Sequence, residues 1–452
     1  MRCARLKEDW LLRGWTDEPR TVLNWKTSEC RRLTEPLWRA ASACDGQTDF
    51  DYIPGVMEQN IMLNKLIAAG IAEDCPPGDA VMPYQGYRLA DNPYLRSVHW
   101  SVTGRCNLKC RHCYMESPDG RYGELPWADM LTIANQLAEA NVHQVELTGG
   151  EPFLRRDLLA LMAELAARQI NVTQIYSNGV LITDEALAGI RALGLSPRFQ
   201  ISFDGCGTHD AMRGISGTEA VTVEAIRRLR RHDFRVAVAT CIDRTNIAAL
   251  DATYELMKDL SVVHWRVGTP HQAGNWRQSD TAMTWEEVLP FCAAIATRWR
   301  RDGRPFFLQM TGFNSAEEDE LLPKYHPDDY DCLTCRLDMS LLPDGTAIPC
   351  PSYTDTAVRD RMPNLLRLPL NRVWSASALR SIIDIRKRHV LDRNSGCAQC
   401  EEFRYCGGGC RAASVAATGD LLAVDPQICD IFKSRYGQRF REQVRTRTSA
   451  GD

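Results

Sequence analysis

The sequence predicts an α/β protein whose central part is a sheet of parallel strands. Between about residue 97 and residue 305, apolar segments of strand length alternate with amphipathic segments of helix length. Strands that alternate with helices form parallel βαβ units with right-handed crossovers. Two groups of cysteines, one directly after the first strand and one near the carboxyl end of the chain, indicate that this fold carries metal chemistry.

The central part is expected to contain six strand–helix units. The strands are predicted at residues 97–102, 144–147, 172–176, 199–203, 234–240 and 264–267, and the helices at 158–167, 184–193, 218–231 and 247–260. In parallel α/β folds, ligands bind at the carboxyl ends of the strands. The motifs that directly follow these strands are therefore the candidate site.

Length and charge set limits on the organisation and on the partners. The 452 residues predict two or three domains. With 54 Lys and Arg against 58 Asp and Glu, the net charge of −4 does not indicate a nucleic-acid partner. No apolar stretch is long enough to span a bilayer, and residues 1–9 lack the apolar core of a signal peptide. We therefore expect a cytoplasmic protein with neither nucleic acid nor a membrane as partner.

The distribution of the 18 cysteines favours metal binding over disulfides. Seven cysteines are scattered singly, whereas three lie near position 110 and eight lie between Cys332 and Cys429. Clustered cysteines in a cytosolic chain are more typical of metal sites or catalysis than of disulfide frameworks.

The first group, Cys106, Cys110 and Cys113, has the spacing x3 then x2. Cysteine thiolates are the usual ligands of a [4Fe–4S] cluster, and three of them in one short loop would leave the fourth iron without a protein ligand. An open metal position is what a reactive site requires. A zinc site or an unrelated loop is the alternative interpretation of these three residues alone.

The segment resembles the CxxxCx-aromatic-C motif of the radical S-adenosylmethionine (SAM) enzymes, with His112 in the aromatic place. The resemblance implies an open, TIM-like (β/α)6 partial barrel. It also implies that the open iron chelates the amino and carboxylate groups of SAM, and that one electron cleaves SAM to methionine and a 5′-deoxyadenosyl radical. Cys106, Cys110 and Cys113 would then be catalytic as cluster ligands, and His112 would be a cofactor-binding residue. Flavodoxin or ferredoxin would be a suitable electron donor.

Residues after the next three strands resemble the SAM contacts of this family. Gly149, Gly150 and Glu151 match the family segment that hydrogen-bonds the SAM amino group. Asn178 lies either in a simple turn or in the pocket floor. Ser202 and Asp204 point the same way because strand residues alternate, and in relatives this position contacts the ribose and carboxylate of SAM.

Three further residues near the strand ends receive a different expectation. Asp210 and Arg213 are expected to shape the loop after the fourth strand rather than to catalyse. His271 rims the expected barrel mouth after the last strand and receives no role.

The second cysteine group runs Cys332-x2-Cys335-x14-Cys350, then Cys397-x2-Cys400-x5-Cys406-x3-Cys410, then Cys429. Two zinc sites are the alternative, since CxxC pairs also bind zinc. The segments 342–350 and 405–410 resemble the SPASM extension of radical SAM enzymes, which holds two auxiliary [4Fe–4S] clusters. The resemblance implies the following ligand sets: Cys332, Cys335, Cys350 and Cys410 for the first cluster, and Cys397, Cys400, Cys406 and Cys429 for the second. Relatives often have more residues between the first two cysteines, and without Cys332 the first auxiliary cluster would keep an open iron.

Residues 1 to about 90 belong to neither module. Two strand-like runs, around Trp10–Trp15 and Val22–Leu23, precede expected helices at 33–43 and 61–71, and residues 75–93 have the composition of a linker. This order resembles the small winged, PqqD-like domains that bind the leader peptides of ribosomally made natural products. A packing cap on the barrel is the alternative.

These observations divide the chain into residues 1–90, a leader-recognition domain with its linker, residues 91–310, the radical SAM partial barrel, and residues 311–452, the SPASM domain. They predict an oxidoreductase with SAM and three [4Fe–4S] clusters that modifies a ribosomal precursor peptide by cross-linking, cyclisation or desaturation. A radical SAM dehydrogenase acting on a small molecule or a protein side chain, like the sulfatase-maturing enzymes, is the alternative. A non-enzymatic metal-binding scaffold is the alternative from another class.

Overall fold

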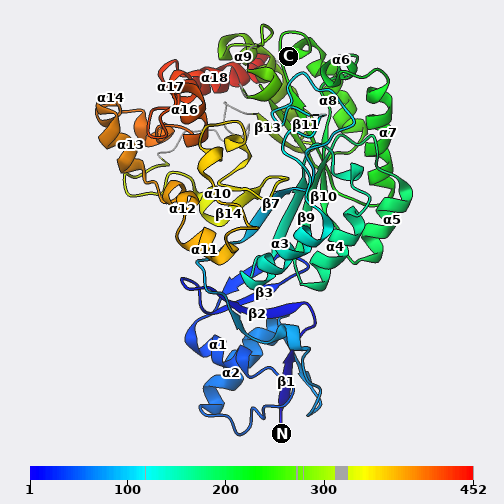
Figure 1. Ribbon diagram of the computed structural model, residues 1–452, viewed down its shortest axis with the longest axis vertical. Coiled ribbons are helices and arrows are strands. Elements are labelled where there is room, and N and C mark those ends of the chain that lie inside the picture. Colours follow the sequence, from blue (N-terminus) through cyan, green and yellow to red (C-terminus); the bar gives the residue numbers. More distant parts are fainter. Residues whose placement is uncertain (118, 271–272, 278, 311–323, 451–452) are drawn as a thin grey trace.

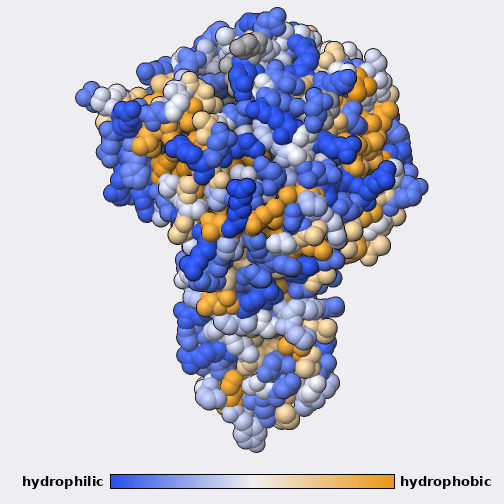
Figure 2. All heavy atoms as spheres, in the orientation of Figure 1, coloured by the Kyte–Doolittle hydropathy of each residue, from blue (hydrophilic) through white to orange (hydrophobic). Residues whose placement is uncertain are grey.

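The computed structural model describes residues 1–117, 119–270, 273–277, 279–310 and 324–450. A small N-terminal part lies below a larger α/β body (Figure 1). Figure 2 shows that the two parts meet at a narrower waist. His271 lies outside the described residues.

The large body is built on one nine-stranded sheet, and this confirms the predicted α/β class with a partial barrel. The strand order is β13-β12-β11-β10-β9-β8-β7-β14-β15. Seven strands follow one another in sequence and are all parallel: β7 (Ser97–Ser101), β8 (Gln144–Thr148), β9 (Asn171–Ser177), β10 (Arg198–Ser202), β11 (Val236–Cys241), β12 (His264–Gly268) and β13 (Phe307–Met310).

The expected strand count was too low. The six expected strands correspond to β7–β12, and the structure adds β13 at one edge of the sheet. At the other edge, β14 (Asp338–Leu341) pairs in parallel with β7, and β15 (Ala347–Ile348) pairs antiparallel with β14. β13 and β14 are four residues each and contain exposed or polar positions, so they lack the apolar run by which a buried strand is predicted from sequence.

Helices cover the convex side of the sheet (Figure 1). They are α3 (Trp127–Glu139), α4 (Leu158–Ala167), α5 (Asp184–Ala192), α7 (Thr218–Arg231), α8 (Leu250–Asp259) and α9 (Trp285–Arg301), with the short α6 (His209–Arg213) after β10. The helices α4, α5, α7 and α8 correspond to those predicted from the sequence, whereas α3 and α9 are additional. α9 begins with a capping box in which the Glu287 amide donates to Thr284 Oγ1 at 3.3 Å.

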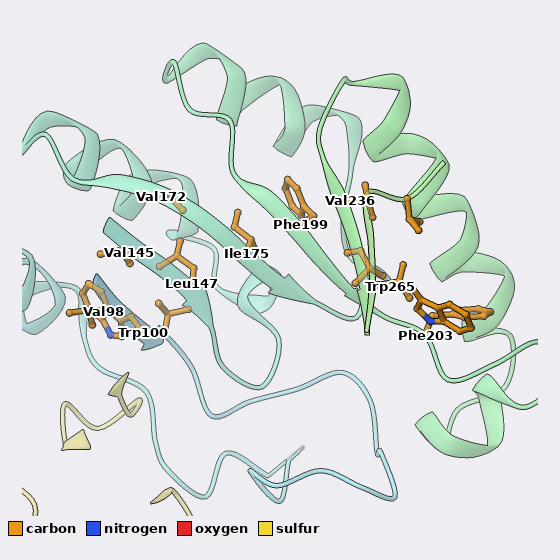
Figure 3. Packing of buried hydrophobic residues seen from close by; sticks show 14 of the residues in the cluster. Val98, Trp100, Val145, Leu147, Val172, Ile175, Phe199, Phe203, Val236 and Trp265 are labelled. Atoms are coloured by element: carbon orange, nitrogen blue, oxygen red, sulfur yellow. The ribbon is translucent and has the colours of Figure 1, made fainter. Parts of the chain in front are cut away.

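Alternate strand residues form the main core. Val98, Val145 and Val172 lie side by side on β7, β8 and β9 and are fully buried. Figure 3 shows them beside a second row, in which Leu147, Ile175, Phe199 and Val236 are neighbours on successive strands. Because strand side chains alternate between faces, these rows pack against the helices and leave the intervening residues for the other face of the sheet.

The N-terminal part has two small sheets and its own core. β1 (Cys3–Leu6) pairs antiparallel with β5 (Ala72–Cys75). A second sheet has the order β4-β3-β2-β6, with β2 (Trp10–Gly14), β3 (Thr21–Asn24), β4 (Glu29–Arg32) and β6 (Arg88–Leu89). Helices α1 (Glu35–Ser42) and α2 (Val56–Ala68) pack on it through a separate apolar cluster. The helix α2 begins five residues earlier than the expected helix at 61–71 and also ends three residues earlier. Gly55, at φ +74°, precedes its first turn.

This N-terminal part contacts the sheet at the amino-terminal ends of its strands. Trp15 Nε1 donates to the carbonyl of Ala140 at 3.0 Å, and Asn141 Nδ2 donates to the carbonyl of Gly14 at 2.9 Å. Asn171, the first residue of β9, donates to the carbonyl of Lys26 at 2.6 Å. The opposite, carboxyl-terminal ends of the strands carry the cysteine loop.

The C-terminal segment consists mainly of short helices, one before β14 and the others after β15. They are α10 (Leu333–Leu337), which precedes β14, then α11 (Leu370–Ser375), α12 (Ala378–Ile383), α13 (Lys387–Arg393), α14 (Ser395–Ala398), α15 (Phe403–Cys406), α16 (Arg411–Thr418), α17 (Pro426–Lys433) and α18 (Tyr436–Ala450). α18 lies along α9, where Arg439 pairs with Glu286 at 2.6 Å. None of the helices in the described ranges is long and apolar enough to cross a membrane.

A buried histidine at the waist should make the folded state sensitive to acid. His143 is 1% exposed, and burial lowers its pKa from 6.5 to about 3. Between these two values the unfolded chain binds a proton that the folded protein does not, so stability falls as the pH falls. The slope from this group is roughly 1.4 kcal/mol per pH unit.

We expect His143→Gln to remove this slope. The measurement is the urea midpoint at about pH 5 and about pH 7, where an ordinary histidine titrates. The control is His232→Gln, at a partly exposed histidine that contacts Asp184 at 2.7 Å. Equal pH slopes for wild type and His143→Gln would contradict the expectation.

Candidate functional site

Three cysteines come together in the loop after β7. Cys106, Cys110 and Cys113 lie near enough for their charges to interact, and the Cys113 amide donates to the Cys110 carbonyl at 3.3 Å. Ser117 Oγ donates to the Gly104 carbonyl at 2.9 Å and fastens the end of the loop to its beginning. The loop therefore presents three thiols at the carboxyl-terminal end of the sheet.

Each of these thiols receives a hydrogen bond from the chain. The amide of Leu108 donates to Cys106 Sγ at 3.5 Å, and the amide of Ser117 donates to Cys113 Sγ at 3.4 Å. Arg213 Nη1 donates to Cys110 Sγ at 3.4 Å. Donors of this kind stabilise thiolates and tune a metal that they bind, so the three residues fit the ligands of an iron–sulfur cluster.

Burial makes the free thiolate costly in this loop. Burial raises the pKa of Cys106 to about 12. A metal ligand must be deprotonated, so cluster assembly releases protons and stabilises the loop together with the metal. The donor set is thus suited to a bound cluster rather than to a free thiolate.

Gly149 and Gly150 let the loop after β8 approach the cysteine loop. A Cβ at position 149 would lie 2.5 Å from the Thr103 carbonyl oxygen, and one at position 150 would lie 2.1 Å from that of Arg105. Gly149 also has φ +151°, which favours glycine. The two glycines therefore hold the backbone that leads into Cys106.

Glu151 is fully buried and joins two strand ends. Its carboxylate accepts hydrogen bonds from Ser177 Oγ at 2.9 Å and from the Asn178 amide at 2.8 Å. Burial raises the pKa of Glu151 to about 7. Asn178 in turn donates through Nδ2 to Asn107 Oδ1 at 2.8 Å, and the same nitrogen lies 3.9 Å from Cys106 Sγ. The structure thus brings residues 149–151 and Asn178 to the cysteine loop.

Asp204 lies beside the loop as well, but its carboxylate is fully buried. Its Oδ2 is 2.8 Å from Arg213 Nε, and its Oδ1 accepts from the Cys241 amide at 3.0 Å. Burial alone would raise the pKa of Asp204, but its neighbours, Arg213 first, together outweigh this effect and hold the pKa below the ordinary value. Ser202, the last residue of β10, is partly exposed.

His112 completes this polar group. His112 Nε2 lies 3.8 Å from Asp204 Oδ2, and burial lowers the pKa of His112 to about 4, so the ring is neutral near pH 7. Ligand atoms of His112, Asp204 and Cys241 lie within 4.8 Å of one another. Since the Asp204 carboxylate is already paired with Arg213, this group is better described as a buried polar network than as a cation site.

Comparison with known proteins identifies the central part of the chain. Residues 100–257 match the radical SAM superfamily.

The chain carries a radical SAM domain.

The relatives divide between two kinds of substrate. The AdoMet-dependent heme synthase of Methanosarcina barkeri (strain Fusaro) is 27% identical over 351 residues, which cover 73% of this chain and 95% of that protein. The PqqA peptide cyclase of Gluconobacter oxydans (strain 621H) is 25% identical and covers 76% of this chain and 92% of that protein. The structure of Streptococcus suis SuiB bound to precursor peptide SuiA has a TM-score of 0.69, with 14% identity, and covers 95% of this chain and 100% of that one.

The eight C-terminal cysteines lie in two groups outside the radical SAM domain. The Cys335 thiol hydrogen-bonds with Cys332 and Cys350, and the charge of Cys350 acts on Cys410. These bonds to its neighbours, Cys332 first, raise the pKa of Cys335. The other four act on one another: Cys397, Cys400, Cys406 and Cys429. Cys332 thus lies with the first group despite its short spacing to Cys335.

Polar residues on the concave face of the radical SAM barrel were missed by the sequence analysis. His99 Nδ1 lies 3.1 Å from Glu146 Oε2, and the Tyr176 hydroxyl donates to the same oxygen at 2.8 Å. The Glu146 side chain is 31% exposed and can therefore meet a bound molecule. The signal was a polar residue at the centre of two apolar strands, Val98-His99-Trp100 and Val145-Glu146-Leu147.

We expect Gly150→Ala to displace the cysteine loop, because the added methyl group would meet the Arg105 carbonyl oxygen at 2.1 Å. A displacement near 1 Å costs about 100-fold in rate, so SAM cleavage should fall by about that factor and iron content should fall with it. Gly437→Ala is the control, since the nearest atom there is a side-chain nitrogen at 3.5 Å. Unchanged iron content and cleavage in Gly150→Ala would contradict the close approach.

Replacing Cys106, Cys110 and Cys113 together with alanine should remove about four irons per chain, the content of one [4Fe–4S] cluster. SAM cleavage should be abolished because no ligand set remains. Iron analysis and detection of 5′-deoxyadenosine test this expectation. Reductive SAM cleavage that persists in the triple variant would show that these residues do not hold the reactive cluster.

Proposed function

We propose that this radical SAM enzyme modifies a ribosomally made precursor peptide by an oxidative step such as cross-linking, cyclisation or desaturation. The observation that carries the proposal is the separate N-terminal part, with its own core and an edge strand that a peptide can join. The likeness to SuiB covers 95% of this chain and so includes most of residues 1–90. The similarity to the PqqA peptide cyclase supports the same class of substrate.

The edge strand β4 is the proposed site for the leader. It pairs with β3, and Glu29, Arg31 and Arg32 on it are exposed. The Leu33 amide donates to the Arg20 carbonyl at 2.8 Å, which fixes the ladder. In that antiparallel register the backbone groups of Cys30 and Arg32 point away from β3. An extended leader would add a strand there, and main-chain hydrogen bonds would supply its affinity.

We propose the division into a leader-recognition domain with its linker (1–90), a radical SAM barrel (91–310) and a SPASM domain (311–452) on this basis. Cys106, Cys110 and Cys113 would hold the reactive [4Fe–4S] cluster, with His112 in the same loop. The residues proposed to line the SAM site are Gly149, Gly150, Glu151, Asn178, Ser202 and Asp204. When bound, the cluster and SAM supply one-electron reduction and a carbon radical that abstracts hydrogen.

Within this site the chain's own residues would hold the cysteine loop in place and orient the substrate. Glu151 fixes the Asn178 amide at 2.8 Å, and Asn178 fixes Asn107 in the cysteine loop at 2.8 Å. Glu146, with its partners His99 and Tyr176, offers a hydrogen-bonding carboxylate on the concave face for a polar group of the substrate. A reductant protein such as flavodoxin or ferredoxin is the proposed electron donor.

The C-terminal cysteines are proposed to hold two auxiliary [4Fe–4S] clusters in the sets given by the SPASM pattern. Eight cysteines for two clusters leave no free iron position. This favours electron transfer over direct binding of substrate, since the substrate radical left by hydrogen abstraction must give up one electron and a proton to become a closed-shell product.

Cys400→Ala should therefore leave 5′-deoxyadenosine formation detectable while the yield of product collapses. Product at the wild-type yield would rule out this role.

A tetrapyrrole substrate is the second candidate. The heme synthase of Methanosarcina barkeri is 27% identical over 73% of this chain. Such an enzyme would need no leader site, so changes at β4 would not alter its turnover. If the substrate is another small molecule or a protein side chain, changes at β4 would likewise leave turnover unaltered.

The deciding experiment uses anaerobically reconstituted full-length enzyme, SAM, a reductant and any short peptide that a reading frame beside its gene encodes. We expect the peptide to lose the mass of two hydrogen atoms per modification. Arg32→Pro should weaken leader binding, because it removes an outward amide from the edge without breaking the β3 ladder. Arg32→Ala, the matched control, keeps that amide and should bind as wild type does.

SAM cleavage without peptide should be the same in wild type, Arg32→Pro and Arg32→Ala. Modification of the full precursor by Arg32→Pro with unchanged kinetics would show that β4 is not the leader site. Turnover of an iron tetrapyrrole and none of the peptide would favour the second candidate.

A further inference from the structure

We propose that Arg213 is a positioning residue that raises the reduction potential of the reactive cluster through a charged hydrogen bond to Cys110. The inference rests on the proposed assignment of Cys106, Cys110 and Cys113 as cluster ligands. It goes beyond the expectation that Arg213 only shapes its loop.

The contact joins two segments that are far apart in the chain. Arg213 Nη1 lies 3.4 Å from Cys110 Sγ, across 103 residues of sequence. The Arg213 residue is only 7% exposed. Water therefore screens this charge little, and a hydrogen bond in such surroundings is stronger than one in solvent.

The guanidinium is held in its orientation by Asp204. Arg213 Nε lies 2.8 Å from Asp204 Oδ2, and the other carboxylate oxygen accepts from the Cys241 amide at 3.0 Å. Asp204 is itself fully buried just after β10, and Cys241 ends β11. Arg213 is thus fixed to the rigid strand ends while its second nitrogen reaches the thiol.

Backbone contacts keep Arg213 and Cys110 together. The Lys109 amide donates to the Arg213 carbonyl at 3.0 Å, and the Arg111 amide donates to the Met212 carbonyl at 3.0 Å. These two bonds flank Cys110 on both sides. At Gly214, φ is +73°, and a Cβ would lie 2.5 Å from the Lys109 carbonyl oxygen. The turn after α6 therefore fits against the cysteine loop only with glycine at this position.

Cys110 differs from the other two cysteines in the charge of its donor. Within the described residues, the donors to Cys106 are a backbone amide and the Asn178 side chain, and the donors to Cys113 are the amides of Met115 and Ser117 and the Ser117 side chain. Among the described donors to these three thiols, only the one to Cys110 carries a full positive charge. Reduction adds one negative charge to a cluster, and a fixed cation beside its sulfur stabilises that state more than the oxidised one.

The two partners should therefore act in opposite directions on the midpoint potential. Arg213→Gln removes the cation and should lower the equilibrium constant for reduction about tenfold. For one electron this corresponds to a midpoint potential about 59 mV lower. Asp204→Asn removes the anion that offsets the cation and should raise the potential. Arg213→Lys keeps the charge and should restore part of the wild-type value.

The measurement is a redox titration of the full-length reconstituted protein followed by electron paramagnetic resonance, with iron content determined for every variant. The reactive cluster is recognised as the one whose signal changes when SAM is added. The control is Arg155→Gln, at another buried arginine, whose nitrogens contact the carbonyls of Val102 and Leu125 and the Asp157 carboxylate. It should leave the potential unchanged.

A full iron content with an unchanged potential in Arg213→Gln would overturn the proposal. If that variant does not retain the cluster, Arg213→Lys and Asp204→Asn decide: shifts in the same direction, or no shift, overturn it. A wild-type protein without a SAM-responsive cluster would overturn the cysteine assignment, and this inference with it. A SAM-responsive cluster together with no effect of Arg213 would leave that assignment intact.

Discussion

The whole site depends on one backbone contact between the ends of β7 and β8. The Gly150 amide donates to the Thr103 carbonyl at 2.8 Å, and the Glu151 amide donates to the Arg105 carbonyl at 2.9 Å. These bonds continue the pairing of the two strands up to the residue before Cys106. Side chains at positions 149 and 150 would prevent it. The cysteine loop, the buried Glu151 and, through Glu151, the end of β9 are therefore placed together by a contact that only glycines allow.

The parts of the fold that sequence could predict are those whose information is local. The strands β7–β12 have apolar runs, and Cys106, Cys110 and Cys113 lie within one short loop. β14 is different, because its pairing with β7 brings Asp338 beside Ser97, 241 residues away in the chain (338 − 97). The contact of Arg213 with Cys110 joins residues 103 positions apart, and no motif spacing predicts it. From the sequence, Arg213 was therefore expected only to shape its own loop.

The C-terminal segment contacts the barrel at one edge of the open sheet and at a helix near the other edge. It begins at one edge, where β14 pairs with β7 and Arg96 Nη2 lies 2.6 Å from Asp338 Oδ2. It ends along α9, the helix that leads into β13 at the other edge. The segment that carries the eight clustered cysteines is thereby attached to the barrel at two places, the strand β7 and the helix α9. Both attachments are made by residues other than the cysteines.

The N-terminal part is attached to the amino-terminal strand ends, so the length of the barrel strands sets a minimum distance between this part and the cysteine loop. The proposed leader site at β4 belongs to the part that contacts the first residue of β9 through Lys26, whereas the cysteine loop lies at the other end of β9, which is seven residues long. At about 3.3 Å per residue, this strand alone spans about 23 Å. A peptide anchored at one end must bridge at least that length in extended form before any of its residues reaches the cysteine loop. Selection among positions in the precursor would then follow from the number of residues between anchor and target, without any need to recognise the target side chain.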